Sequence, residues 1–361
     1  MDLYDTATLV GVLNRQQPET FFFFQWFPDE ITFTTEKIMF DELGEDWRIL
    51  APFVAPHVEG RVMARKGFDT KSFKPAYVKP KHDIDINQQF TRRVGEAPFT
   101  GTLTPQQRYD ATMAENFRVE RDMIDRRINW MCAMAMIEGS VVVSGEDYPS
   151  VTVDFGRDAS LSDVLTSTAR WGESAADPLG DLNTMSKRSR RLSGGRITDY
   201  IMGEGAYERF YADSEVKELL NTNYRIGGTA ADHSLLSSND LDGNAELKAV
   251  LRGGQSGEVA RVWTYAGYYH ERDPDTGAIT EGYYIDENAV VGVGNRLGGV
   301  QAFGAIKDPN AKLQPMRYFP RIVDKKNDDP AHEYTLTQSA PLPIPREPNN
   351  SFKLQVHDPA T

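Results

Sequence analysis

Cysteine is almost absent from this sequence, in which Cys132 is the only one among 361 residues. A single cysteine excludes an internal disulfide and every metal site that is built from several thiolates. This usage is typical of a chain that is made in a reducing compartment. We therefore interpret Cys132 as a small buried hydrophobic side chain.

Long hydrophobic runs are also missing. The most hydrophobic segment, FFFFQWF at residues 21–27, occupies seven positions, whereas a membrane-spanning helix needs about 20 apolar residues. The chain begins with MDLY, an acidic start that lacks the basic and apolar stretches of a signal peptide. We expect a chain that is neither inserted into a membrane nor exported.

The aromatic segment at 21–27 allows two interpretations. It is either a strand or turn in the core of its own chain, or an aromatic latch that docks on a neighbouring subunit, because aromatic rings bury large areas in both settings. We leave both interpretations open. The candidate latch residues are Phe21, Phe22, Phe23, Phe24, Trp26 and Phe27.

Basic residues are in the minority, with 40 lysines and arginines against 53 aspartates and glutamates and a formal net charge of -13. Proteins that grip nucleic acid over a broad surface need clustered lysines and arginines. We therefore expect DNA to be at most a non-specific neighbour. One segment departs from this average, since residues 57–82 hold seven basic residues against two acidic ones, a net charge of +5. The seven are Arg61, Arg65, Lys66, Lys71, Lys74, Lys79 and Lys81.

All seven basic residues belong to a segment, 53–94, that we expect to form two extended arms around a turn at Lys66–Asp69. A long basic hairpin on an acidic chain suits contact with a neighbouring subunit, because complementary potentials steer and register such contacts. The alternative is a solvated edge hairpin whose lysines block aggregation.

Motifs for catalysis or ligand binding are absent or incomplete. The glycines at 292, 294, 298 and 299 are spaced G-x-G-x-x-x-G, unlike a dinucleotide fingerprint. The six histidines stand at no metal-binding spacing. A phosphate could bind the basic cluster Lys187, Arg188, Arg190 and Arg191, but we favour a solvated helix face. We expect no catalytic residue, no cofactor and no metal ion, and hence no enzyme.

One long helix is expected from Thr104 to Gly139. Thr104 can cap it, Gln107 completes a capping box, and Gly139 supplies a stop. At about 1.5 Å per residue it spans about 50 Å. The pairs Arg121–Asp125 and Asp122–Arg126 are expected on its exposed side. Its apolar stripe comprises Tyr109, Met113, Phe117, Ile124, Ile128, Met131 and Ala135.

Shorter elements are expected on both sides of this helix. A strand is predicted at 31–40 and a hairpin at 141–156. From about residue 160, short helices alternate with strands in a compact second domain. The helices are expected at 178–194 and 207–220, and the strands at 197–202, 259–269 and 282–285.

Four stretches carry a family resemblance: FTTEKI at 33–38, YVKPKHDI at 77–84, VDFGR at 153–157 and DPAHEYTLTQSAPL at 329–342. In these residues, their order and their spacing, the chain resembles the lambda-type phage major capsid proteins, the capsid protein E family. The resemblance extends over essentially the whole sequence.

The resemblance implies an α+β chain with the Hong Kong 97-like phage capsid fold. That fold has an N-terminal arm, an extended loop called the E-loop, a peripheral domain with a long spine helix, and an axial domain. In this sequence the resemblance implies the N-terminal arm and first peripheral strand at 1–52, the E-loop at 53–94, the peripheral domain with the spine helix at 95–159, the axial domain at 160–305, and a return to the peripheral domain with a C-terminal tail at 306–361.

The implied function is that of a major capsid protein of a tailed double-stranded-DNA phage. Such proteins self-assemble as hexamers and pentamers into an icosahedral shell that houses the genome. The implied partners are further copies of the chain, a scaffolding protein, a portal and a decoration protein, with assembly in the host cytoplasm and a final place in the virion. The alternatives are an encapsulin-like compartment or tail component, and an enzyme that uses the glycines near residue 292.

Overall fold

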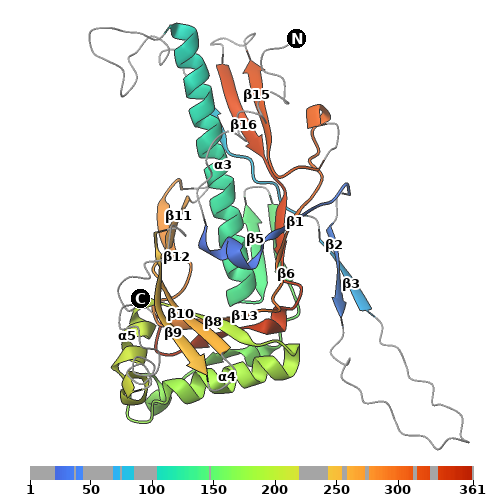
Figure 1. Ribbon diagram of the computed structural model, residues 1–361. Helices are drawn as coiled ribbons and strands as arrows, with labels where there is room; N and C mark the ends of the chain where they lie inside the picture. The colour runs from blue at the N-terminus through green and yellow to red at the C-terminus, as the bar shows by residue number, and fades with distance from the viewer. Residues whose placement is uncertain are drawn as a thin grey trace, which may run out of the picture.

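The elements of this chain are arranged around one long helix, α3 (Pro105–Ile137), which runs down the upper part of the molecule (Figure 1). A larger sheet with two helices lies at the C-terminal end of α3, at the bottom of the view. The computed structural model describes residues 21–35, 38–43, 68–73, 75–84, 104–145, 148–218, 243–253, 258–272, 276–311, 315–325 and 332–359.

The ends of α3 confirm the predicted helix. The Thr104 hydroxyl accepts a hydrogen bond from the Gln107 amide (3.2 Å), and the Gln107 side chain accepts one from the Thr104 amide (2.8 Å). This capping box satisfies two of the backbone donors that a helix start leaves without partners. Gly139 follows the last turn at φ +69°, a left-handed conformation that favours glycine.

The apolar stripe of α3 is buried as predicted, but the exposed charged pairs were predicted wrongly. Arg121, Asp122 and Asp125 are 4%, 3% and 2% exposed. The reason is that α3 is covered along more than one side, by strands that come from both ends of the chain. The apolar periodicity of a helix predicts one buried face. It does not predict that a second face, which carries charged residues, is buried as well.

Three small sheets lie along α3. Beside its upper part, β4 (Lys81–Asp83), β15 (Phe319–Lys325) and β16 (His332–Gln338) form an antiparallel sheet in the order β15-β16-β4. A second sheet has the order β1-β14-β17, with β1 (Asp29–Thr32), β14 (Val300–Phe303) and β17 (Pro341–Ile344). The predicted hairpin at 141–156 is confirmed by β5 (Ser140–Gly145) and β6 (Tyr148–Asp154).

A six-stranded sheet forms the lower part of the molecule, in the order β7-β18-β13-β8-β10-β9. Helix α4 (Pro178–Ser193) packs against it and ends at Gly194 (φ +71°), as expected. Helix α5 (Glu204–Ala212) begins earlier than the predicted 207–220 and is interrupted at Asp213, after which residues 214–218 are helical again. The strands are β7 (Ser162–Val164), β8 (Ile197–Met202), β9 (Ala245–Gly253), β10 (Glu258–Tyr265), β13 (Ala289–Gly294) and β18 (Ser351–Gln355).

The segment 306–361, for which a return to the peripheral domain with a C-terminal tail was expected, contributes strands to more than one sheet. β15, β16 and β17 do lie along α3, but β18 is inserted between β7 and β13 of the six-stranded sheet. Packing accounts for this position. Phe352 is fully buried, and its ring occupies the space over Gly292 of β13, where a Cβ atom would lie 2.2 Å from the ring.

Two hairpin ribbons project from this arrangement. β11 (Tyr268–Arg272) pairs with β12 (Ile279–Tyr283) beside α3, and β2 (Ile38–Leu43) pairs with β3 (Phe68–Phe73) away from the main body (Figure 1). The single strand predicted at 31–40 is therefore two strands, β1 and β2, in different sheets. Phe68 and Asp69 were predicted in a turn but belong to β3. Much of the segment 53–94 lies outside the described residues.

Two large clusters make up most of the core. One lies between α3, the aromatic segment at 21–27 and the near face of the six-stranded sheet, and it contains Cys132 as a buried thiol, as predicted. The other lies between α4, α5 and the same sheet. Within the described residues no helix is both long and apolar enough to cross a membrane.

Candidate assembly surfaces

The aromatic segment forms a short 3-10 helix, η1 (Phe22–Trp26), that packs into its own chain. The Phe22 ring stacks on Tyr265 with 5.0 Å between centroids, and the Phe23 ring meets the same tyrosine edge-on at 5.0 Å. The Phe23 amide donates a hydrogen bond to the Asn129 side chain of α3 (3.2 Å). The aromatic rings thus join α3 to β10.

Of the two interpretations left open for this segment, the core interpretation accounts for the burial. Phe22, Phe23 and Phe27 are fully buried, and Phe21 and Trp26 are nearly so. Phe24 is partly buried beneath the Arg317 guanidinium. The structure therefore uses these rings within one subunit, and their contact with a neighbour stays a prediction.

The basic residues of segment 57–82 are described in part. Lys79 and Lys81 are exposed, and their ammonium nitrogens lie 4.9 Å and 4.7 Å from the ring centroids of Tyr77 and Tyr334. Lys71 lies on β3. Four members of the set lie outside the described residues: Arg61, Arg65, Lys66 and Lys74. Their role at an interface stays a prediction.

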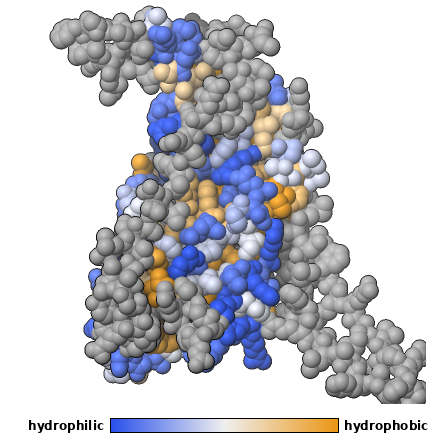
Figure 2. Space-filling view, in the orientation of Figure 1, coloured by the Kyte–Doolittle hydropathy of each residue, from blue (hydrophilic) through white to orange (hydrophobic). Residues whose placement is uncertain are grey.

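The β11–β12 ribbon presents an exposed face that the sequence analysis did not single out. Its register places Tyr268 opposite Tyr283 and His270 opposite Glu281, so these side chains share one face. Tyr268 and Tyr283 are 53% and 61% exposed. An open cavity of about 740 Å³ lies between this ribbon and α3, with Trp130 in its wall. Figure 2 shows hydrophobic residues in separate spots among hydrophilic ones on this side of the molecule.

A buried carboxylate attaches α3 to the β15-β16-β4 sheet. Glu120 is fully buried and accepts hydrogen bonds from the hydroxyls of Thr335 (2.7 Å) and Thr337 (2.6 Å), and the His82 Nδ1 lies 3.3 Å away. Burial raises the pKa of Glu120 above its ordinary value, and the hydrogen bonds act against this shift. The sequence does contain a signal for this residue, because Glu120 lies between Phe117 and Ile124 on the apolar stripe.

A second buried carboxylate connects α3 to the segment before β15. Asp125 accepts hydrogen bonds from the Arg317 guanidinium (2.8 Å) and from the Tyr318 hydroxyl (2.6 Å). The guanidinium also lies over the rings of Phe24 and Phe303, at 5.5 and 5.6 Å from their centroids. Burial and the neighbouring carboxylate raise the pKa of the Tyr318 hydroxyl well above its usual range.

Arg157, from the VDFGR stretch, closes the C-terminal end of α3. Its guanidinium donates to the carbonyls of Met136 and Ile137, at 2.7 Å each. These are carbonyls that a helix end leaves without intrahelical partners. Burial lowers the pKa of Arg157 to about 10, so its charge is retained at neutral pH.

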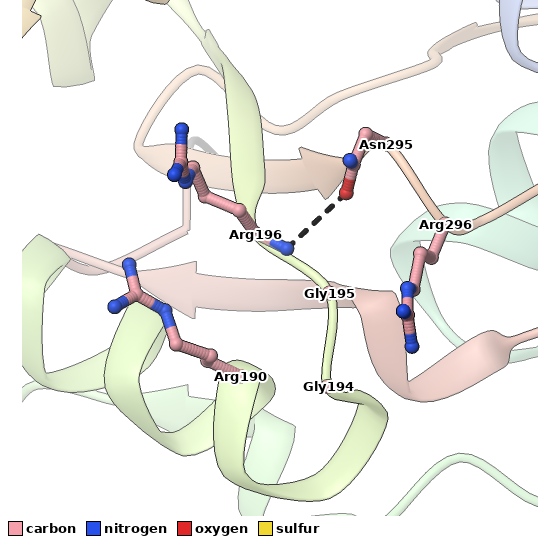
Figure 3. A pocket seen from close by; sticks show the side chains of 6 residues that line it. All are labelled: Arg190, Gly194, Gly195, Arg196, Asn295 and Arg296. Carbon is pink, nitrogen blue, oxygen red and sulfur yellow. Dashed lines mark hydrogen bonds between the residues drawn. The ribbon is translucent and has the colours of Figure 1, made fainter. Parts of the chain in front are cut away.

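Three arginines line an open cavity of about 390 Å³ at the C-terminal end of α4 (Figure 3). Arg190 comes from the last turn of α4, Arg196 from the residue before β8, and Arg296 from the loop after β13. Of the basic cluster predicted as a solvated helix face, Arg190 lines this cavity. Arg188 instead bonds to the Ser160 carbonyl, and Lys187 and Arg191 are exposed.

The glycines that suggested a nucleotide site have a packing explanation. Gly292 and Gly294 lie in the buried strand β13. A Cβ atom would lie 2.2 Å from the Phe352 ring at the first and 2.3 Å from the Asn350 side chain at the second. Their spacing therefore reflects close approach within a sheet rather than a phosphate-binding loop. Among the described residues no group of three or more His, Cys, Asp or Glu side chains could hold a metal ion.

The whole chain is similar to known phage capsid proteins. The major capsid protein of Escherichia phage N15 is 28% identical over 99% of this chain and 100% of its own length, and that of Escherichia phage lambda is 27% identical over the same shares. A crystal structure of a prophage protein of Escherichia coli CFT073, assigned as a capsid protein, matches with a TM-score of 0.73 at 23% identity, over 98% of this chain and 99% of that chain.

These similarities confirm the predicted α+β, Hong Kong 97-like capsid fold. The family model described as phage major capsid protein E matches residues 5–356. This chain therefore belongs to the phage major capsid protein E family.

Proposed function

We propose that this chain is the shell subunit of a tailed-phage head, which assembles with copies of itself as hexamers and pentamers into an icosahedral shell around a double-stranded DNA genome. The observation that carries the proposal is the match of residues 5–356 to the capsid family. The proposal assigns the chain a structural role, with self-association in place of catalysis.

The placement of the family-like stretches supports this role. His82 of YVKPKHDI and Thr335 of DPAHEYTLTQSAPL both contact Glu120, and Arg157 of VDFGR caps the end of α3. These contacts attach the spine helix to segments that are far apart in the sequence. Breaking one of these contacts would leave a buried polar group without a hydrogen-bond partner, which costs free energy and disfavours other arrangements. We infer that these attachments keep the subunit in one conformation while it makes contacts with neighbouring subunits in the shell.

Each domain of the proposed shell subunit is assigned to a part of this chain. Residues 53–94 would be the E-loop, which includes β3 of the projecting β2–β3 ribbon, and the basic residues of this loop would lie across a neighbouring subunit. The peripheral domain would be built on α3 and the axial domain on the six-stranded sheet. Burial of apolar surface, at about 25 cal/mol per Å², would offset the entropy of association when many contacts act together.

The partners proposed beyond further copies of the chain are a scaffolding protein, a portal and a decoration protein. Assembly would take place in the host cytoplasm, and the packaged DNA would lie against the finished shell. The relatives named as major capsid proteins support the place in the virion.

Negative-stain imaging with light scattering tests the proposal, on the full chain alone and with a scaffolding protein from the same genome. We expect closed shells, or capsomers that close when the scaffold is added. Tubes in place of closed shells would favour a tail component. A chain that stays monomeric under both conditions would contradict every assembly function.

A further inference from the structure

We propose that the three-arginine cavity at the C-terminal end of α4 binds phosphate groups of the duplex DNA backbone. This inference rests on the proposed function, which brings packaged DNA against the shell. It goes beyond that function because it assigns a local site on a chain whose net charge of -13 disfavours broad contact with nucleic acid.

The cavity gathers positive charge from three separate segments. Its lining residues are Arg190, Gly194, Gly195, Arg196, Asn295 and Arg296, so three of the six carry a guanidinium and none carries a carboxylate. In Figure 3 the side chains of Arg190 and Arg196 extend in the same direction, and Arg296 stands on the other side of the Gly194–Gly195 segment. The three arginines line one open cavity, with two guanidinium groups on one side of this segment and one on the other.

The backbone that carries the arginines is held in place by a buried asparagine. Asn350 is fully buried, and its side chain accepts a hydrogen bond from the Arg296 amide (2.6 Å) and donates one to the Ser193 hydroxyl (3.2 Å). A Cβ atom on Gly195 would lie 2.5 Å from the same side chain. Asn350 thus ties together the end of α4, the start of β8 and the loop after β13. A rigid frame of this kind lowers the ordering cost of binding.

The guanidinium groups, rather than the backbone, would contact the ligand. The amides of Arg196 and Arg296 already donate to Asn295 and Asn350. The C-terminal end of α4 carries partial negative charge, which favours arginines there and disfavours an anion close to the backbone. Arginine presents planar donor forks that match phosphate oxygens. One such site binds weakly, but the many copies in a shell would act together along the DNA.

The helix-end charge is also the rival explanation, because Arg190 in the last turn of α4 stabilises the helix without any ligand. This explanation does not extend to Arg196 and Arg296, which lie outside the helix. The test therefore substitutes these two. The variant is R196Q/R296Q, and the matched control is K217Q/K307Q, which removes two exposed charges elsewhere.

The measurement is the fluorescence anisotropy of a short labelled DNA duplex, titrated with the unassembled full chain at several salt concentrations. We expect R196Q/R296Q to bind the duplex at least about tenfold more weakly than the unsubstituted chain. The negative slope of log K against log salt should also become smaller in magnitude by about 2, since each phosphate contact contributes about 0.9. The control should change binding less than about twofold. R196K/R296K, which keeps the charge but removes the forks, should bind with intermediate affinity.

Equal losses in the variant and the control would overturn the site, because DNA would then respond only to overall charge. Inorganic phosphate that competes as strongly per site as duplex would also overturn it in favour of a free-phosphate site, and equal competition by polyglutamate would indicate a carboxylate partner. If R196Q/R296Q unfolds, Arg296→Gln alone serves the same comparison. Shell formation by the same variants is scored separately, so that a failure of assembly and a failure of DNA binding remain distinguishable.

Discussion

At the scale of the residue, the buried acid Glu120 makes the attachment of α3 depend on pH. Its pKa is raised above the ordinary 4.5 in the folded chain, chiefly by burial. The folded state therefore holds the proton more tightly than the unfolded state. The stability that this group contributes is present in full below about pH 4.5, and it is lost as the pH rises through the raised pKa.

The substitution Glu120→Gln tests this dependence, because glutamine resembles the protonated acid and does not titrate. We expect the free energy of unfolding of E120Q, minus that of the unsubstituted chain, to increase as the pH rises from about 4.5 towards neutrality. Urea unfolding at several pH values measures the difference. His82 also contacts Glu120, so both chains are compared again in a His82→Gln background. A difference that stays constant with pH would contradict the prediction.

At the scale of the element, substitutions in η1 can distinguish the core interpretation of the aromatic segment from the latch interpretation. Phe22 is fully buried against Tyr265, so Phe22→Ala should destabilise the unassembled chain by about 3–5 kcal/mol. Phe24→Ala, at a partly exposed ring of the same helix, should cost clearly less. Thermal or urea unfolding of the unassembled chain gives both values. An F22A chain of unchanged stability that fails only in assembly would support the latch interpretation instead.

In strand β13, Gly292 is required for close packing against the neighbouring strand and not for a turn. Gly292→Ala should destabilise the chain by about 1–3 kcal/mol, because a Cβ atom would lie 2.2 Å from the Phe352 ring. Phe352→Leu in the same chain should recover part of the loss by making room for the new methyl group. Chemical unfolding of G292A and of G292A/F352L checks the pair. If the leucine gives no recovery, the packing explanation of this glycine fails.

At the scale of the whole molecule, the uneven distribution of charge should control assembly. Segment 57–82 carries +5 on a chain whose total is -13, and contacts between opposite potentials form faster at low ionic strength. We expect the rate of shell formation, followed by light scattering, to fall as salt is added. Lys79→Glu with Lys81→Glu should slow it further.

The same double substitution should leave the fold intact, since both lysines are exposed and each loses a ring contact worth about 0.5–1 kcal/mol. K217E/K307E reverses two exposed charges outside this segment and is the matched control. Equal slowing by both pairs would show that only the total charge matters, and that the basic segment has no special part in assembly.

The parts of this molecule that could be predicted are those whose causes lie close together in the sequence. The capping box of α3 is formed by Thr104 and Gln107, three residues apart, and the apolar stripe repeats every three or four residues. The hairpin at 141–156 and the helix from Pro178 to Gly194 follow from similar local signals. For the same reason, the four family-like stretches could be found without the structure.

The partners of the buried charges could not be predicted, because they come from distant parts of the chain. Asp125 was expected to pair with Arg121 on the helix surface but instead bonds to Arg317, 192 positions away. Glu120 bonds to Thr335, 215 positions away. Helical spacing identifies which residues are neighbours on one helix, and it carries no information about what covers that helix.

The sequence by itself determined the spine helix, the shell-protein family and the acidic balance that excludes a broad nucleic-acid surface, because each depends on local spacing, motif or composition. Tertiary structure alone decided that η1 is part of the core, that β18 lies in the six-stranded sheet, and that Arg190, Arg196 and Arg296 line one cavity. The physical reason is that burial and charge proximity are properties of the packed chain. They arise only when segments hundreds of residues apart compete for the same neighbours.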